Sequence, residues 1–456
     1  MSQTLTDSTT KRIVILGAGF GGLYTALRLA KRLRRAKQLV DITLIDRNNY
    51  FLFSPLLHEV IPAMVEMHHV VHPIRHALAH SPVRFHETEV QHVDLVRKSV
   101  QTTIGDFSYD YLVLALGSVT NFFSQDALAQ HAFPLKTLVH AVRLRNHLLT
   151  MLEAASNTAD RAERRRLLTV VQVGAGFTGL ETITEIHDFL HAALRRDYPQ
   201  LEADDLRLLL IDALPALTAP SDGKLADYTM RLLSRKGIES RFTTSVSDAG
   251  AGWVTLSTGE RLETNTLIWS AGVTANPIVR TLPVEHGSGL RLTVLPSLQL
   301  PAFPEVFALG DAALVLEHGL PLPTTAQVAN QQAPVVADNL LALLQGKPTR
   351  AFKFQRLGEL ASLGAYHAIA EMGPLRFHGW LAWWIWRTVY LLKMPWWEAR
   401  VHIAADWTLD LFFPRDTSRI DLGPCAQCPL DACPGHRDRL NPTPTPTPTP
   451  ALTPHT

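Results

Sequence analysis

Two glycine-rich segments with the same pattern stand far apart in this chain. Residues 17–22 read G-A-G-F-G-G, and residues 174–179 read G-A-G-F-T-G. Each segment follows an apolar, strand-like run, precedes a helix-like run, and matches G-x-G-x-x-G. Such glycines allow a tight turn, close approach of the backbone to a pyrophosphate, and close packing of a helix on its strand. Two copies in this context predict two dinucleotides bound by one chain and a redox reaction between them.

The phosphates of each dinucleotide are expected at a helix N-terminus, where free N–H groups favour anions. A turn that merely packs tightly is the alternative for a single copy, and the matched pair argues against it. The residues predicted to hold the first dinucleotide are Gly17, Gly19, Phe20, Gly21 and Gly22. Those predicted to hold the second are Gly174, Gly176 and Gly179.

An acidic residue is expected at the end of the second strand of each unit, where it binds the ribose hydroxyls. Asp46 ends one apolar run and Asp212 ends another. Arg47, also predicted to contact the first cofactor, follows Asp46, whereas no arginine directly follows Asp212. A 2′-phosphate needs a cation there, so the second site favours NADH over NADPH.

Three further segments point to cofactor contacts, two of them with a flavin in the first site and one with NADH in the second. Residues 83–114 contain several short strands, with Val90 among them, and lead to Gly117. That ending resembles the small-residue segment that passes close to a flavin nucleotide, and a similar strand ends at Gly272 in the second unit. Gly310-Asp311 follows another apolar strand. In flavoproteins with two dinucleotide domains, this aspartate binds the ribityl part of FAD. We therefore predict FAD contacts at Val90, Gly117 and Asp311, and an NADH contact at Gly272.

The order of these motifs predicts an α/β fold with two Rossmann-like domains, the NADH domain being inserted into the FAD domain. The predicted parts are a disordered N-terminus at 1–10, FAD-binding segments at 11–165 and 291–345, an NADH-binding domain at 166–290, a membrane-associated or dimerisation region at 346–415, and a tail at 416–456.

Two glutamines suggest where an electron acceptor would bind. Gln327 and Gln331 are four residues apart and share one face of a predicted helix. Their amides could hold a carbonyl head group, or they could simply cap or solvate the helix. Ala326 at the start of this helix, together with Gln327, is also predicted to contact FAD.

Residues 377–397 contain six of the nine tryptophans, the residue type suited to a bilayer interface. Arg387 lies in the middle of the segment, and Pro395 ends the helix that could form there. We predict a helix that lies in the membrane interface. The alternative is an aromatic helix buried against the core or against a second subunit.

Composition excludes some functions and leaves others open. The net charge of +1 gives no basic field for nucleic acid. The N-terminus is polar and lacks the apolar region of a secretory signal.

All three cysteines lie far from the glycine motifs, so a redox-active pair beside the flavin is not expected. Cys425, Cys428, Cys433 and His436 could form a zinc site, but free thiols are an equal alternative. The Thr-Pro repeats that follow predict an extended, disordered tail.

These segments together resemble the type II NADH:quinone dehydrogenases, monotopic flavoproteins of respiratory membranes, over about residues 11–415. The resemblance rests on both glycine motifs, on W-S-A-G-V at 269–273, on A-L-G-D at 308–311 and on A-Q-V-A-N-Q-Q at 326–332. The last segment is similar to the family's A-Q-x-A-x-Q-Q at the quinone pocket, which implies that Gln327 and Gln331 face the quinone.

The resemblance also implies that Glu181 lies near the flavin and takes part in quinone protonation. A helix N-terminal acid favoured by the helix dipole is the alternative for this residue. The implied enzyme passes a hydride from NADH to non-covalent FAD and two electrons to a membrane quinone, without pumping protons. It implies a homodimer docked on the cytoplasmic face of the cell membrane.

Two other functions remain open at this stage. One is a reductase of a specialised naphthoquinone or of a soluble carrier such as ferredoxin. The other is a non-catalytic flavoprotein that senses NAD and signals through a partner surface. Sulfide:quinone oxidoreductases have a similar outline but need active-site cysteines, which the body of this chain lacks.

Overall fold

Residues 10–220 and 222–419 are described by a computed structural model, and the elements named below belong to the unit that ends at Thr417. The first glycine motif belongs to a six-stranded sheet of order β21-β22-β9-β1-β2-β5. Its strands are β1 (Lys11–Leu16), β2 (Val40–Asp46), β5 (Arg84–Glu87), β9 (Tyr111–Leu114), β21 (Gln299–Leu300) and β22 (Phe303–Ala308). All pairs are parallel except β21 with β22. The chain thus returns to this sheet after residue 298.

The second glycine motif belongs to a five-stranded parallel sheet of order β11-β18-β12-β13-β14. Its strands are β11 (Ala132–Pro134), β12 (Thr169–Val173), β13 (Arg207–Ile211), β14 (Glu239–Arg241) and β18 (Thr266–Trp269). Every side chain of β12 is buried, as expected for a parallel strand covered on both faces. The insertion of one Rossmann-like unit into another, predicted from motif order, is confirmed.

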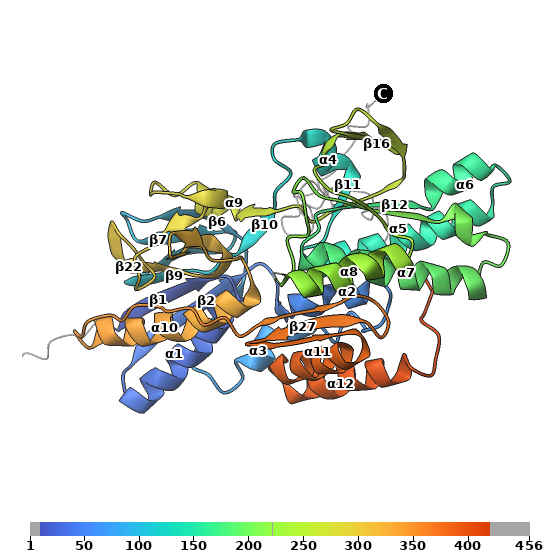
Figure 1. Cartoon of the computed structure of the whole chain (residues 1–456). Coiled ribbons are helices and arrows are strands. Elements are labelled where there is room, and N and C mark those ends of the chain that lie inside the picture. Colours follow the sequence, from blue (N-terminus) through green and yellow to red (C-terminus); the bar gives the residue numbers. More distant parts are fainter. Residues whose placement is uncertain (1–9, 221, 420–456) are drawn as a thin grey trace, which may run out of the picture. The chain divides into compact units, whose positions relative to one another are not determined.

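Helices cover these sheets because each has an apolar stripe to bury. The longer ones are α1 (Gly22–Ala36), α5 (Leu138–Ser156), α7 (Phe177–Arg196), α8 (Gly223–Arg235) and α10 (Ala326–Leu344). α1 and α10 pack side by side along the first sheet (Figure 1). α1 buries Leu23, Leu29 and Leu33, while its Arg32 Nε lies 3.0 Å from an oxygen of Asp338 on α10.

Antiparallel segments complete the two domains and join them. One three-stranded sheet comprises β6 (Val90–Asp94), β7 (Ser99–Thr102) and β8 (Gly105–Ser108). A second three-stranded sheet comprises β15 (Val246–Gly250), β16 (Trp253–Leu256) and β17 (Arg261–Glu263). β10 (Ser118–Thr120) pairs with β19 (Val273–Ala275). Because β10 leaves the first sheet and β19 leaves the second, this pair ties the chain together where it passes between domains.

The C-terminal region adds an antiparallel sheet that the sequence did not predict. It consists of β26 (Glu359–Ser362), β27 (Ala368–Met372) and β28 (Leu375–His378), followed by α11 (Gly379–Lys393) and α12 (Trp397–Leu409). α11 ends before Pro395, as the sequence indicated. Among the described residues, no helix combines the length and the hydropathy that crossing a membrane requires.

Candidate active site

The first glycine turn has the geometry of a dinucleotide site. Gly17 has φ of +93°, and a Cβ added there would lie 2.3 Å from the carbonyl oxygen of Ala115. A Cβ on Gly22 would lie 1.8 Å from the carbonyl oxygen of Gly17. No atom lies within 4 Å of the Cβ position of Gly19. These positions therefore serve a tight turn, close helix packing and an open approach for a ligand.

The second turn repeats this geometry. Gly174 has φ of +101°, and a Cβ there would lie 2.8 Å from the carbonyl carbon of Ser270. A Cβ on Gly179 would lie 1.8 Å from the carbonyl oxygen of Gly174, whereas Gly176 leaves 3.5 Å to Thr218 Oγ1. The open middle glycine of each turn stands at or near the N-terminus of a long helix, α1 or α7. Each glycine turn therefore has room for a pyrophosphate at the N-terminal end of its helix.

The two predicted ribose-binding carboxylates make the same contacts in both domains. Asp46 accepts hydrogen bonds from the N–H groups of Ala18 at 2.6 Å and Asn48 at 2.8 Å. Asp212 accepts them from Ala175 at 2.6 Å and Leu214 at 2.8 Å. Each carboxylate thus fixes its own glycine turn from the end of the next strand. Burial raises the pKa of Asp46, although these N–H groups act in the opposite direction.

Other predicted cofactor residues surround the first turn. Arg47 follows Asp46 and is exposed. Val90 lies two residues after Thr88, whose N–H donates a hydrogen bond to the backbone carbonyl of Asp46 at 2.8 Å. Phe20 packs edge-on against Phe51 with ring centroids 4.9 Å apart. The Cβ position of Gly21 lies 3.1 Å from the Leu309 side chain.

The two small-residue strand ends lie at the connection between the domains. Gly117 has φ of +68° and open space at its Cβ position. Gly272 accepts a hydrogen bond from the Asn121 N–H at 3.1 Å, and its Cβ position lies 3.3 Å from the ring of Phe123. Both glycines therefore lie where the chain passes from one nucleotide domain to the other.

Asp311 belongs to a polar group that sequence reasoning found only in part. It follows β22, and its Oδ2 accepts hydrogen bonds from Ser118 Oγ at 2.5 Å and Lys136 Nζ at 3.1 Å. Lys136 also donates to Ser118 Oγ at 2.8 Å. Gln332 of α10, which is 1 % exposed, accepts the N–H of Gly310 at 2.6 Å and so fixes this turn. No spacing rule points to Ser118 or Lys136, because they lie 193 and 175 residues from Asp311 along the chain.

The two predicted quinone ligands differ in their surroundings. Ala326 is the first residue of α10, and Gln327 beside it is half-buried. The Gln331 amide donates to the carbonyl of Gln355 at 2.8 Å and accepts that residue's N–H at 3.0 Å. Gln331 therefore holds the segment that leads into the C-terminal sheet.

Glu181 lies in a buried polar cluster formed by three parts of the chain. It is 8 % exposed, and its Oε1 accepts the Ser362 N–H of β26 at 3.3 Å. Its Oε2 lies 3.5 Å from Nδ1 of His58 in α2 (Leu57–Val60). Burial raises the pKa of Glu181 well above its usual value and lowers the pKa of His58 to about 3. Burial therefore favours the uncharged form of both groups in this contact, the protonated acid of Glu181 and the neutral imidazole of His58.

Two more buried glutamates extend this cluster. Glu185, one turn along α7, accepts the Ser362 hydroxyl at 3.0 Å and lies 3.6 Å from Nη1 of Arg415. Glu59 accepts the indole N–H of Trp407 at 2.7 Å. Burial raises the pKa of Glu185, and it raises the pKa of Glu59 to about 8. Of this cluster, sequence reasoning identified Glu181 alone.

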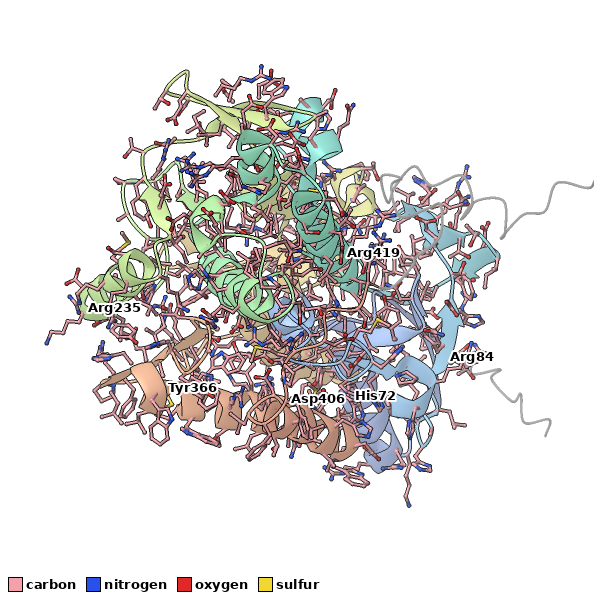
Figure 2. All side chains as sticks on the ribbon, turned by 90° about the vertical axis from the view of Figure 1, so that its right-hand side faces the viewer. His72, Arg84, Arg235, Tyr366, Asp406 and Arg419 are labelled. Carbon is pink, nitrogen blue, oxygen red and sulfur yellow. The ribbon has the colours of Figure 1, made fainter. Side chains whose placement is uncertain are left out.

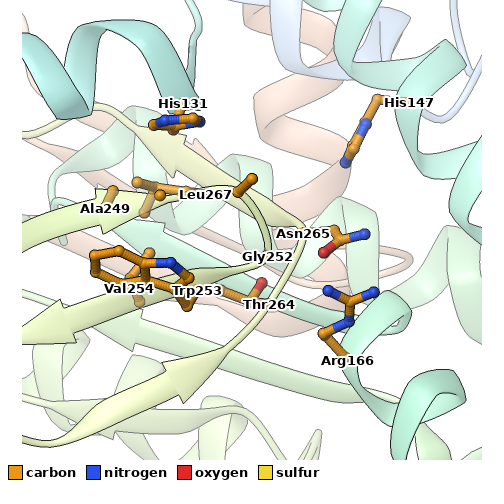
Figure 3. A pocket seen from close by; sticks show the side chains of 12 residues that line it. His131, His147, Arg166, Ala249, Gly252, Trp253, Val254, Thr264, Asn265 and Leu267 are labelled. Atoms are coloured by element: carbon orange, nitrogen blue, oxygen red, sulfur yellow. The ribbon is translucent and has the colours of Figure 1, made fainter.

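A cavity of about 280 Å³ lies elsewhere, between the β15–β17 sheet and the helices α4 (Asp126–His131), α5 and α6 (Arg161–Leu167). Figure 3 shows His131 and His147 on one side of it and Trp253 on the other. No predicted site residue lines it. The conjectured metal ligands Cys425, Cys428, Cys433 and His436 lie outside the described residues, among which no cluster of three metal-binding side chains occurs.

Family models match almost the whole described chain. Residues 11–333 match the model described as pyridine nucleotide-disulphide oxidoreductase, and residues 357–416 match the NDH2 C-terminal domain. The fold and the paired glycine turns thus define an oxidoreductase of the class that binds a flavin and a pyridine nucleotide on two Rossmann-like domains. More narrowly, the chain belongs to the type II NADH:quinone oxidoreductase family.

Individual relatives agree with this assignment. A type II NADH:quinone oxidoreductase of Mycobacterium tuberculosis is 33 % identical over 420 residues, which cover 89 % of each chain. A probable NADH dehydrogenase of Dictyostelium discoideum is 31 % identical over 418 residues, or 90 % of this chain and 91 % of that protein. The structure of NDH2 from Plasmodium falciparum in complex with NADH has the same fold, with a TM-score of 0.82 at 20 % identity, over 90 % of this chain and 100 % of that chain. The family predicted from the sequence is confirmed.

Proposed function

We propose that this chain is an FAD-dependent NADH:quinone oxidoreductase that pumps no protons. The main support for this function is the pair of glycine turns, one on each of the two Rossmann-like sheets. Each turn has an open middle glycine and a hydrogen bond to its own aspartate. When bound, the flavin supplies the redox chemistry, since it accepts a hydride from a nicotinamide and passes two electrons to a quinone.

The residues of the first sheet would hold FAD without a covalent bond. Gly17, Gly19 and Gly22 would accommodate the pyrophosphate, and Asp46 the ribose. Asp311, held by Ser118 and Lys136, would accept hydrogen bonds from the ribityl hydroxyls. In this arrangement Lys136 is a positioning residue, because it fixes the carboxylate that contacts the cofactor.

The residues of the second sheet would hold NADH. Gly174, Gly176 and Gly179 would accommodate its pyrophosphate and Asp212 its ribose, and Gly272 would make a further contact with NADH. The absence of an arginine directly after Asp212 favours NADH over NADPH.

Glu181 and Gln327 would serve the quinone. Reduction of a quinone to a quinol takes two electrons and two protons, of which the hydride of NADH brings one. Glu181 would supply the second proton, because burial favours its protonated form, and Glu185 lies one turn further along α7. Gln327 would donate to a quinone carbonyl, while Gln331 holds the backbone at residue 355.

The membrane is proposed to meet the chain at α11 and α12, on the cytoplasmic face of the cell membrane. Large apolar side chains are exposed there, among them Trp380 at 61 % and Trp397 at 68 %. Because lipid-soluble quinones reside in the bilayer, this placement brings them to the chain. A homodimer is also proposed, on the family likeness alone.

Comparing electron acceptors tests this function against its rivals. NADH oxidation by the purified protein is measured with ubiquinone, menaquinone and ferredoxin. The proposal predicts turnover with a membrane quinone and little with ferredoxin. Turnover with ferredoxin alone would favour a soluble-carrier reductase, and flavin reduction without any turnover would favour an NAD sensor.

A further inference from the structure

A second cavity, of about 600 Å³, lies at the far end of the polar face of α7, beyond Glu181 and Glu185. Its walls come from α7, the end of α8, the β26–β27 connection, α11 and the segment after α12. Figure 2 shows two of its residues, Arg235 and Tyr366, on the same side of the view. None of the residues assigned above to FAD, NADH or quinone lines it.

The cavity carries an excess of positive charge. Its cationic side chains are Arg195, Arg235, Lys236, Arg387 and Arg415, against the carboxylates of Asp188 and Asp410 alone.

Both carboxylates already have partners. Asp188 pairs with Lys236 and accepts the Ala365 N–H at 2.7 Å. Asp410 accepts a hydrogen bond from Nε–H of Arg415 at 3.2 Å. Arg415 lies 3.6 Å from the buried carboxylate of Glu185 as well. Among the described residues, the guanidinium groups of Arg195, Arg235 and Arg387 therefore have no ion pair with a carboxylate of the cavity wall, which favours an anionic ligand.

Two guanidinium groups in the wall have hydrogen-bond donors without acceptors. Arg387 is only 4 % exposed, and its Nη1 donates to the Trp407 carbonyl at 3.3 Å. Its Nε and Nη2 have no hydrogen-bond partner among the described residues. Nη1 of Arg415 makes no hydrogen bond there either, although it forms an ion pair with Glu185 at 3.6 Å. Leaving buried charged donors unpaired is costly, and a guanidinium fork matches the oxygens of a phosphate or carboxylate.

The cavity continues into an apolar surface. The Arg387 guanidinium lies 3.8 Å from the ring centroid of Trp383, which lines the cavity. Trp384, 43 % exposed, lies edge-on to Trp383 with centroids 5.2 Å apart. Phe413, 64 % exposed, also lines the cavity. A ligand bound here would thus find donors for an anionic head and an aromatic surface for an apolar tail.

We propose that this cavity binds the anionic headgroup of a membrane phospholipid. The phosphate oxygens accept hydrogen bonds from Arg387 and Arg415, and the acyl chains lie along the exposed aromatic residues of α11 and the segment after α12. Free phosphate shares the headgroup chemistry but has nothing to place on the apolar surface. The cavity shares no residue with the sites assigned to NADH and the flavin. Lipid binding at the cavity can therefore be tested independently of quinone turnover.

Vesicle flotation of the flavin-loaded full chain tests this site. The vesicles are phosphatidylcholine with or without phosphatidylglycerol. The test variant carries Arg195→Gln and Arg235→Gln, both at exposed positions of the rim. The control carries Arg97→Gln and Arg280→Gln, which are also exposed and change the charge equally. Wild type and control should bind the anionic vesicles about tenfold better than the neutral ones, and the rim variant should lose most of that preference.

Thermal unfolding separates a lipid from a free anion. Soluble dihexanoylphosphatidylglycerol should raise the Tm of wild type and control, but not that of the rim variant. Arg387→Lys, which keeps the charge but removes the fork, should lose this rise as well. Inorganic phosphate should have little effect. An equal rise with inorganic phosphate, no rise with either probe, or an undiminished rise in both test variants would overturn the proposal.

Discussion

At the scale of single residues, burial changes the acid–base behaviour of three glutamates where α2, α7 and β26 meet. Glu59, Glu181 and Glu185 are all buried, and the pKa of each is raised chiefly because the ionised form loses hydration. Trp407 and Ser362 donate hydrogen bonds to them, which lowers the cost of ionisation only in part. The folded protein therefore binds protons here that the unfolded chain releases.

This difference predicts how stability depends on pH. The folded-state pKa of Glu59 is about 8, above the ordinary value of 4.5. Its contribution to stability is present at low pH and is lost as the pH rises toward 8. Glu59→Gln keeps an oxygen for the Trp407 indole but does not titrate. We expect urea unfolding between pH 5 and 8 to show a shallower fall in free energy for this variant, by up to about 1.4 kcal/mol per pH unit. An unchanged slope would mean that Glu59 ionises normally.

Glu181 is expected to act in only one half-reaction. Glu181→Gln removes the proton but keeps a carbonyl oxygen that can accept the Ser362 N–H. In stopped flow, quinone reduction by the reduced enzyme should slow by about 10²-fold or more, as for loss of a proton donor. Flavin reduction by NADH should change little. Equal slowing of both steps would assign Glu181 a structural role.

The sequence predicted Glu181 but not its partners. Glu181 stands two residues after a glycine motif, so its place in the first turns of α7 could be inferred locally. Ser362 lies 181 residues away along the chain, and His58 approaches from the other Rossmann-like domain. Such contacts depend on how domains and the C-terminal sheet pack, which local spacing does not specify.

At the scale of elements, the two glycine turns differ in what each position tolerates. Gly179→Ala puts a methyl group into the backbone of Gly174, whereas Gly176→Ala meets only an ordinary contact. We expect Gly179→Ala to destabilise the fold by about 2–4 kcal/mol. Gly176→Ala should cost no more than about 1 kcal/mol and keep its flavin, yet raise the KM for NADH. Thermal unfolding, flavin content and steady-state kinetics of the matched pair check this. Equal stability of the two variants would contradict the close helix packing at Gly179.

Elements with a strong local pattern could be predicted, and those that depend on distant pairing could not. The β1–α1–β2 and β12–α7–β13 units combine apolar runs with glycine turns, and both are present. The end of α11 before Pro395 follows from proline chemistry. The β26–β28 sheet has strands of four or five residues. The sheet packs against α7 and α11, which are distant or separate elements, so its own sequence gave no comparable signal.

At the scale of the whole molecule, the exposed aromatic residues of α11 should govern membrane binding. Trp380→Ser with Trp384→Ser removes two indoles that are 61 % and 43 % exposed. Vesicle binding should fall by roughly tenfold or more, while NADH oxidation with a water-soluble acceptor remains. Val96→Ser with Ile104→Ser is the matched control, since both side chains are exposed beside the β6–β8 sheet. A similar loss in the control would show that general surface hydrophobicity is responsible.

We propose that one chain passes electrons from NADH through a flavin to a quinone. Anaerobic titration of the purified protein with NADH, followed by quinone, tests it most directly by visible absorption. We expect a flavin spectrum that bleaches as NADH is added and returns when quinone follows. A protein that cannot be loaded with flavin, or whose reduced flavin is not reoxidised by any membrane quinone, would contradict this electron path.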